Sequence, residues 1–209
     1  MSILDRVIGA VTPPESEAAR AKARQQALLA TSAGDWLSMI IAHHIQIERA
    51  FLAAKLAGDE RARGAAQRRL TLLLTGHSLA EEAVLYPALV RADEKGHSTT
   101  AYAEQSATKV QLSLLQDIVP MSQDYLDKLE HLRAAVAHHV YEEESKWFLE
   151  LKRKLPAADQ DKLSQRYQEQ FARYMGDDAV ELVVTENAAG QRFQQVHPSA
   201  TALPSGSGN

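Results

Sequence analysis

Two short segments of this chain each carry a histidine followed four positions later by a glutamate. The first pair is His77 and Glu81, and the second is His139 and Glu143. Because residues four apart lie on one face of a helix, each pair would present an imidazole and a carboxylate in the same direction. Two such pairs on separate helices would supply nitrogen and oxygen donors to one shared interior. The spacing therefore predicts a metal site, and a dinuclear one if the two helices face each other.

The elements that must position these pairs are helices, because apolar residues recur at helical spacing and Gly and Pro fall between the repeating segments. Four long helices joined by short loops are typical of an up-down-up-down four-helix bundle. We expect Pro87 to kink or shorten the second helix, and Ser98 to cap the third after a loop that contains His97. The helices are expected over residues 35–57, 59–92, 98–119 and 122–154.

Shorter segments flank the bundle, which we expect to occupy residues 35–154. An N-terminal helical extension is predicted over 1–34 and a C-terminal helix over 155–175. Residues 176–209 are expected to be a mostly irregular tail, with one short strand-like stretch at 179–184. The predicted fold class is therefore an all-α four-helix bundle with extra helices at both ends.

The apolar faces of the helices select which histidines point inward. Neighbouring residues on a helix point about 100° apart, so only one imidazole of each doublet can face the interior. The apolar series selects His44 over His43 and His139 over His138. We expect His43 and His138 to lie on the solvated surface, and the alternative is that they support the ligands from behind. Three glutamates that fall off the apolar series are also expected to be exposed: Glu82, Glu142 and Glu144.

Buried carboxylates at these positions require compensation. An unpaired buried carboxylate is costly, and two close together repel each other further. One or two divalent cations would remove both problems, with Glu81 and Glu143 as bridges and one nitrogen from each of His44, His77 and His139. The seam pattern therefore favours metal binding over a core of hydrogen-bonded histidines.

Composition restricts the other function classes. The 209 residues are 45% hydrophobic and 24% charged, as in ordinary globular proteins, and the net charge is −4. The basic segments 61–69 and 152–154 lack interleaved aromatic residues, so we interpret them as solvated helix faces and expect no nucleic-acid binding. The absence of Cys excludes disulfides and thiolate chemistry. No apolar run reaches the length of a membrane span, and the start does not look like a signal peptide, so we expect no membrane association and a cytoplasmic location.

The residues on these faces resemble the motif of the hemerythrin-like, HHE cation-binding domain. That motif has a His on the first helix, His-x-x-x-Glu on the second, usually a His on the third, and His-x-x-x-Glu or Asp on the fourth. The Leu-Tyr-Pro of residues 85–87 is also similar to the family, and the resemblance covers roughly residues 35–154. It implies a non-haem di-iron site. The matching residues are His44, His77, Glu81, His139 and Glu143.

The third helix departs from the family pattern, because Gln105 occupies the position of its usual histidine. An amide oxygen is a weaker and harder ligand than imidazole. Gln105 could coordinate, hydrogen-bond a metal-bound water, or leave a position open, so one metal would have fewer nitrogen donors than is usual in the family. Nearby Tyr102 is either close to that position or simply a core residue. The departure disfavours reversible oxygen carriage and favours an open position for a small ligand, or weaker binding of the second metal.

Three functional hypotheses follow. The leading one is a non-haem di-iron protein that binds or reacts with dioxygen, peroxide or nitric oxide, in which one iron takes His44 and His77 and the other takes His139 with Gln105 or water. The alternative is a metal- or oxygen-responsive sensor without turnover, whose terminal helices offer surfaces for a partner or a homo-oligomer. The third is a structural bundle that has lost its metals. The sequence does not decide whether the protein is an enzyme.

Overall fold

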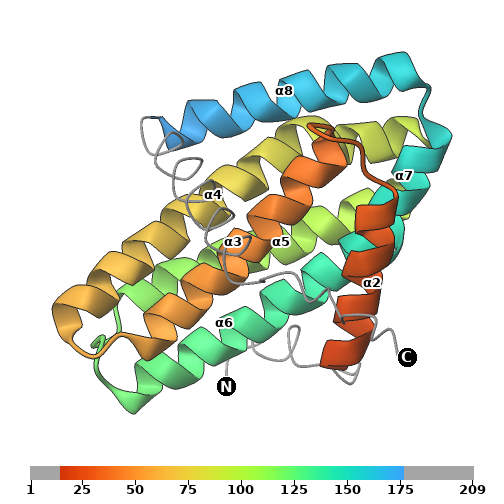
Figure 1. The fold of residues 1–209 in the computed structure, drawn as a ribbon. Helices are drawn as coiled ribbons and strands as arrows, with labels where there is room; N and C mark the ends of the chain where they lie inside the picture. Colours follow the sequence, from red (N-terminus) through yellow and green to blue (C-terminus); the bar gives the residue numbers. More distant parts are fainter. Residues whose placement is uncertain (1–14, 177–209) are drawn as a thin grey trace, which may run out of the picture. The chain divides into compact units, whose positions relative to one another are not determined.

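A computed structural model describes residues 15–176 of the chain (Figure 1). The sequence predictions for the first residues, for the strand-like stretch at 179–184 and for the tail lie outside these residues. The described part is helical, with one π-helical segment, η1, inserted near the end of the fourth bundle helix. The elements are α2 (Glu17–Leu29), α3 (Trp36–Leu56), α4 (Glu60–Arg91), α5 (Lys95–Gln116), α6 (Gln123–Glu142), η1 (Glu143–Trp147), α7 (Phe148–Lys154) and α8 (Ala157–Met175).

Four of these helices form the bundle. Consecutive helices from α3 to α6 pack against each other, and α6 packs back on α3 (Figure 1). The short connections make neighbours antiparallel, so the all-α, up-down-up-down architecture predicted from the sequence is confirmed. Within residues 15–176, no helix combines the length and apolar character that a bilayer span requires. The largest fully buried side chains include Trp36, Tyr86, Tyr125, Tyr167, Phe51 and Phe148.

Side-chain caps define three of the bundle helices at their starts. Asp35 accepts a hydrogen bond from the backbone N–H of Ser38 at 2.7 Å, Asp59 from that of Ala62 at 2.8 Å, and Ser122 from that of Tyr125 at 3.1 Å. Such caps satisfy N–H groups that have no partner inside the helix. These starts lie within one residue of the predicted ones for this reason.

The start of α5 differs from its prediction. The helix begins at Lys95, so His97 lies in its first turn rather than in a loop, and Ser98 is not its cap. The residue before the helix, Glu94, makes no side-chain cap hydrogen bond, and Asp93 takes a left-handed conformation with φ of 66°. The sequence gives no cap signal at the true start, which is why the prediction was late by about a turn.

Pro87 does not shorten α4, which continues through it to Arg91. Proline removes one backbone donor from the helix interior. On both sides of it, however, Leu85, Tyr86 and Leu89 are completely buried. Their packing against the bundle stabilises the helical backbone across the missing hydrogen bond.

The π-helical segment η1 was not predicted. The N–H of Phe148 donates to the carbonyl of Glu143, five residues earlier, instead of four. This widened turn buries both Glu143 and Glu144, with 0% and 1% of their surface exposed. The expectation that Glu144 is solvent-exposed is therefore wrong. π-helical turns inside α-helices occur frequently at functional sites.

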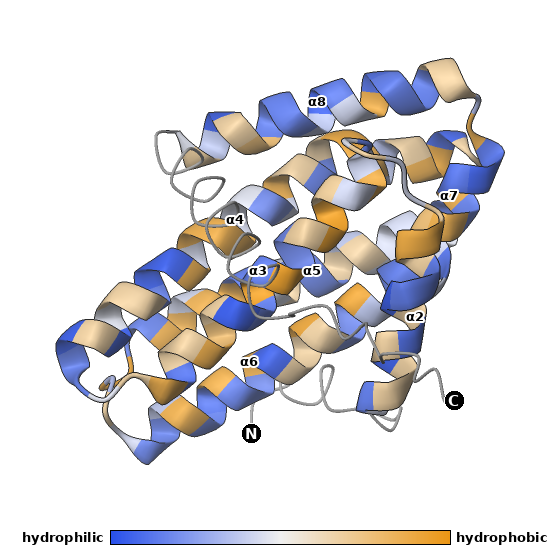
Figure 2. Cartoon of the chain, in the orientation of Figure 1, coloured by the Kyte–Doolittle hydropathy of each residue, from blue (hydrophilic) through white to orange (hydrophobic). Residues whose placement is uncertain are grey.

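Two further helices pack on the bundle. α2 contacts η1, α3 and α6. α8 is mostly hydrophilic (Figure 2), but it buries Leu163, Tyr167 and Phe171, which are four residues apart and so share one face. Its Ser164 hydroxyl accepts a hydrogen bond of 2.9 Å from the backbone N–H of Trp36 at the start of α3. The bundle core is thus extended on two sides.

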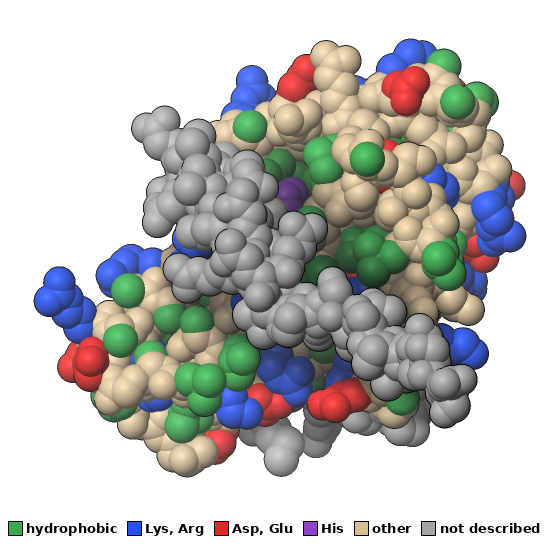
Figure 3. Space-filling view, viewed as in Figure 1, with side chains coloured by type: hydrophobic (Ala, Val, Ile, Leu, Met, Phe, Trp, Pro, Cys, Tyr) green, Lys and Arg blue, Asp and Glu red, His purple; other side chains and the backbone are tan. Residues whose placement is uncertain are grey.

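A buried arginine caps the other end of α3. The Arg63 guanidinium donates to the backbone carbonyls of Ala54 and Lys55 in the last turn of α3, to that of Ala57 just after it, and to that of Pro120. Only 5% of Arg63 is exposed, so the interpretation of residues 61–69 as a wholly solvated face is wrong at this position. On the face drawn in Figure 3, Lys and Arg side chains are interspersed with Asp and Glu.

Candidate metal centre

Four buried side chains from three elements converge in the middle of the bundle. His44 comes from α3, His77 and Glu81 from α4, and Glu143 from η1. Each offers one potential ligand atom, and these atoms all lie within 4.8 Å of one another. The His-x-x-x-Glu spacing places His77 Nε2 3.3 Å from Glu81 Oε2, as expected for residues one helical turn apart.

Several polar atoms at this centre have no hydrogen-bond partner. They are His44 Nε2, Glu81 Oε1, Gln105 Oε1 and Glu143 Oε2, and all are buried. His44 Nε2 and Glu143 Oε2 are 3.3 Å apart, without hydrogen-bond geometry. Unpartnered buried nitrogen and oxygen atoms are costly, and their convergence is what a cation would satisfy. The imidazole and carboxylate donors therefore fit a divalent metal such as iron or zinc.

Tyr86 brings a phenol oxygen into a second group of donors beside the first. Its Oη lies 3.1 Å from His139 Nε2, 3.1 Å from Glu143 Oε1 and 3.3 Å from Glu81 Oε2. His139 Nε2 is itself 3.2 Å from Glu143 Oε1. Neighbouring ligands of an octahedral metal with bonds of about 2.1 Å lie about 3 Å apart. Tyr86, His139 and Glu143 are thus close enough to one another to hold a single metal ion.

Gln105 faces the same centre from α5. Only 3% of it is exposed, its amide nitrogen donates to Glu81 Oε2 at 2.6 Å, and the same nitrogen contacts Tyr86 Oη. Its amide oxygen is buried without a partner. Amide nitrogen and oxygen can exchange places by a flip of the side chain. Gln105 can therefore present either a hydrogen-bond donor or an oxygen ligand to the centre.

Each of the three inward histidines is held on its outer nitrogen. His44 Nδ1 lies 2.8 Å from Glu144 Oε1, and His77 Nδ1 lies 3.1 Å from Tyr167 Oη. His139 Nδ1 lies 2.7 Å from Glu104 Oε2. A hydrogen-bonded Nδ1–H directs Nε2 to a metal and fixes the ring orientation. This outer ring of partners is typical of metal-binding histidines.

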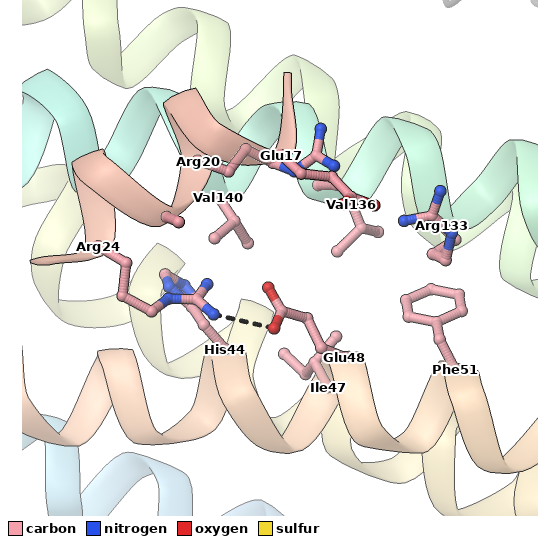
Figure 4. Close-up of a pocket in the computed structure, with 12 residues that line it drawn as sticks. Glu17, Arg20, Arg24, His44, Ile47, Glu48, Phe51, Arg133, Val136 and Val140 are labelled. Carbon is pink, nitrogen blue, oxygen red and sulfur yellow. Dashed lines mark hydrogen bonds and ion pairs between the residues drawn. The ribbon is translucent and has the colours of Figure 1, made fainter. Parts of the chain in front are cut away.

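Arg24 links α2 to this outer ring. Its Nε donates to both carboxylate oxygens of Glu144 at 3.1 Å. Its Nη1 donates to Glu48 at 2.8 Å (Figure 4). An Arg24–Glu144–His44 chain thus runs from α2 to the centre. Residues of α2, α3 and α6, His44 among them, line a cavity of about 330 Å³. Figure 4 shows how these side chains surround it.

Charge balance at the centre is achieved with protons when no cation is present. Burial alone would lower the pKa of His44, but the carboxylates of Glu143 and Glu144 raise it to about 9. Burial would likewise lower the pKa of His139, but the charge of Glu143 and the hydrogen bond that His139 donates to Glu104 raise it well above the ordinary value. In turn the two imidazolium groups hold the pKa of Glu143 below its usual range, against the effect of burial.

Other groups are kept neutral. Burial and the neighbouring Glu143 charge raise the pKa of Glu81 well above normal, and burial with the same two carboxylates raises that of Tyr86. Burial and the positive charge of His44 lower the pKa of His77 well below 6.5 and that of His43 to about 3. A metal ion bound here would displace the protons on His44, His139 and Glu81, because coordination requires deprotonated donors.

The structure brings all six predicted site residues to the one centre. They are His44, His77, Glu81, Gln105, His139 and Glu143. The choice of His44 and His139 within the doublets agrees with this placement. His43 does not lie on the solvated surface as expected: its ring stacks on Phe171 with centroids 3.8 Å apart. His138 stays near the surface, where its Nδ1 lies 2.8 Å from Glu15.

Several residues around the centre were missed from the sequence. Tyr86 is part of the Leu-Tyr-Pro segment, which was noted only as a family likeness. Glu144 was missed because the π-helical turn that buries it has no sequence signature. Tyr102 points away: its hydroxyl donates to the Glu82 carbonyl, and its ring packs edge-on against Tyr86. Glu82 and Glu142, expected to be exposed, are half-buried.

Comparison with known families identifies the same family that the sequence motif resembles. The model of the hemerythrin HHE cation-binding domain matches residues 17–151, which include all six predicted site residues. The chain belongs to the hemerythrin HHE family. A protein described as a DNA nickase, from Nostoc sp. (strain PCC 7120 / SAG 25.82 / UTEX 2576), is 35% identical over 99 residues. That match covers 47% of this chain but only 26% of the Nostoc protein. Comparison with solved structures gave no significant match.

Helix α8 lies beyond the residues matched by the hemerythrin HHE model, yet it provides Tyr167 to His77. The matched residues include α2, with the Arg24 chain to Glu144. Membership of this cation-binding family and the converging His and Glu side chains support cation binding by this chain.

Proposed function

We propose that this protein is a non-haem di-iron protein of the hemerythrin HHE family that binds or reacts with a small ligand such as dioxygen, peroxide or nitric oxide. The observation that carries the proposal is the convergence of buried, unpartnered imidazole and carboxylate atoms in the bundle centre. A structural bundle without metals would leave these atoms unsatisfied at a cost in free energy.

The donor atoms divide into two groups that share two carboxylates. His44 and His77 would hold one iron, and His139 with Tyr86 would hold the other. Glu81 and Glu143 contact both groups, so they are suited to bridge. The sequence predicted that the second iron would lack one nitrogen donor, because Gln105 stands where the family has a histidine. Tyr86 would supply an oxygen donor beside Gln105 instead. The second position therefore has an oxygen-rich donor set, which is favourable for a ferric ion.

The iron, when bound, would supply the redox chemistry and the open coordination position. The chain contributes orientation and exclusion of water. Glu144, Glu104 and Tyr167 fix the three imidazoles through their Nδ1 atoms. The cavity of about 330 Å³ borders His44 but none of the other proposed ligands. The fixed imidazoles are what supports metal binding here.

Anaerobic titration of the metal-free protein with Fe(II) tests the proposal. We expect close to two iron ions per chain, followed by oxo-bridged ferric absorption on exposure to air or peroxide. The double variant His77→Ala/His139→Ala should bind no iron at the centre. His131→Ala, which alters an exposed histidine on α6, is the matched control and should bind as the parent does. Binding that survives the double substitution would refute the proposed site.

A sensor function is the second candidate, and the Arg24–Glu144–His44 chain favours it because this chain connects a ligand histidine to a peripheral helix. A change at His44 would alter the partner of Arg24 and with it the docking of α2. A change in oligomer size or in α2 protection on Fe(II) loading, without turnover of oxygen or peroxide, would support the sensor over a catalyst.

A further inference from the structure

A hydroxyl group from outside the matched family region reaches a ligand histidine. Tyr167 on α8 is completely buried, and its Oη lies 3.1 Å from His77 Nδ1 and 2.9 Å from His43 Nδ1. α8 begins at Ala157, after the hemerythrin HHE match ends at residue 151. The phenol therefore joins two histidines of the bundle from a helix that the family model does not include.

The number of hydrogens available indicates which group donates in each of these two hydrogen bonds. A phenol has one hydrogen to donate and two lone pairs that accept. His77 can give Nε2 to a metal only if its proton resides on Nδ1, and then Tyr167 must accept at that bond. The single hydrogen of Tyr167 would otherwise be buried without an acceptor, so we assign it to His43 Nδ1. The chain runs His77 Nδ1–H to Tyr167 Oη, and Tyr167 O–H to His43 Nδ1.

Without His43, the hydroxyl of Tyr167 would be free to rotate toward His77 and donate to its Nδ1. The proton of His77 would then reside on Nε2, where it would block coordination. His43 disfavours this alternative because its Nδ1 accepts the hydrogen bond from the Tyr167 hydroxyl. Its ring is fixed for this task by stacking against Phe171 of α8, with centroids 3.8 Å apart and planes 22° apart.

We propose that Tyr167 and His43 are positioning residues that hold His77 in the Nδ1–H tautomer, so that α8 is a functional part of the metal centre. The inference rests on the proposed metal binding for its purpose, but the tautomer can be measured without a metal. It assigns a role to the doublet histidine that does not face the centre, and to a helix outside the matched domain.

The first test is the tautomer of His77 in the metal-free full chain, from the ¹⁵N chemical shifts of its two ring nitrogens. We expect the Nδ1–H form in the parent protein. Tyr167→Phe keeps the ring that packs on Phe171 but removes the hydroxyl, and should move His77 toward the Nε2–H form. Ser164→Ala is the matched control, because it removes a hydrogen bond between α8 and Trp36 without touching a histidine. It should leave the His77 tautomer unchanged.

The second test is the dissociation constant for Fe(II), measured anaerobically by competition with a chromophoric chelator. Loss of an outer partner of a metal-binding histidine weakens metal binding about 10- to 100-fold. We expect at least a tenfold loss in Tyr167→Phe, a loss of at least similar size in His43→Leu, where Tyr167 would donate to His77 Nδ1, and none in Ser164→Ala. The proposal fails if Tyr167→Phe binds Fe(II) as the parent does, or if Ser164→Ala weakens binding equally.

The two measurements separate failure of this inference from failure of the proposed function. No Fe(II) binding by the parent protein would refute the proposed function, while the ¹⁵N shifts would still decide the direction of the hydrogen-bond chain. Tight Fe(II) binding by the parent, with an Nε2–H tautomer of His77 in the metal-free protein, would refute the inference alone.

Discussion

Tyr86 places a phenol oxygen where the predicted ligand set had a gap. Its Oη lies 3.1 Å from both His139 Nε2 and Glu143 Oε1. If the phenol joins the donor set, the ferric protein should show the visible charge-transfer band of an iron–phenolate bond. We expect Tyr86→Phe to lose this band. Tyr102→Phe is the control, because Tyr102 packs on Tyr86 but sends its hydroxyl to a backbone carbonyl. A band that persists in Tyr86→Phe would exclude this ligand.

Glu144 acts on the centre through another residue. It accepts from His44 Nδ1 and is itself held by Arg24. Glu144→Gln keeps an oxygen acceptor but removes the charge that favours a basic imidazole, so we expect Fe(II) affinity to fall by about tenfold. The same substitution at Glu142, which is half-buried and does not contact a ligand histidine of the centre, should have little effect. Equal affinities for the two variants, in the same chelator competition, would contradict this role.

Residue spacing predicted which histidines and glutamates face inward, because helical periodicity fixes direction. It could not predict their outer partners. Tyr167 lies 90 positions after His77, and only the docking of α8 brings the two together. Tyr86 carries an aromatic ring that would suit a purely apolar core equally well, so its type gave no indication of a role at the centre. Side chains that act across elements need the tertiary arrangement to be found.

The elements themselves were predictable where local chemistry marks their ends. Three helix starts are marked by N-cap residues, whose side chains accept cap hydrogen bonds: Asp35, Asp59 and Ser122. The start of α5 has no such cap, and η1 results from a hydrogen-bond shift of one residue that leaves no compositional trace. That shift matters for the centre, since it buries Glu144 beside Glu143.

Arg63 shows how an element end is stabilised from another helix. Its guanidinium serves four carbonyls, two of them in the last turn of α3 and one just after it. Arg63→Met should cost about 2 kcal/mol, because charged hydrogen bonds to otherwise unpartnered carbonyls are lost. For a chain of this size the melting temperature should drop by roughly 4–8 °C. Arg61→Met, at an exposed position on the same helix, should leave it within a degree or so. A similar drop in both variants would argue against the cap.

At the scale of the whole molecule, folding and the centre are linked through charge. The cluster draws side chains from α3, α4, α5, α6 and η1, so its imidazoles and carboxylates come together only when the bundle is complete. Buried like charges would oppose that assembly. In the metal-free protein, protons on His44 and His139 offset the carboxylates, and a cation would do the same more strongly.

This linkage predicts how stability depends on pH. The pKa of His44 is about 9 in the folded protein and about 6.5 unfolded, and that of His139 is also raised. A raised histidine pKa gives stability that is complete below the unfolded value and is lost as pH rises through the folded value. The metal-free protein should therefore lose stability between about pH 6.5 and 9. The lowered pKa values of His43 and His77 act below pH 6.5 instead, where protonation favours unfolding.

Metal binding should reverse this trend, because coordination requires the same imidazoles to be deprotonated. A ligand that binds only the folded state raises the melting temperature, and more so as its affinity increases. We therefore expect the difference in melting temperature between Zn(II)-loaded and metal-free protein to be small near pH 6 and to grow toward pH 9. Zn(II) avoids oxidation during the thermal scans. A His44→Leu variant, which lacks the group with the pKa of about 9, should show a weaker pH dependence in its metal-free form. A constant difference across this range would mean that protons and metal do not compete for one centre.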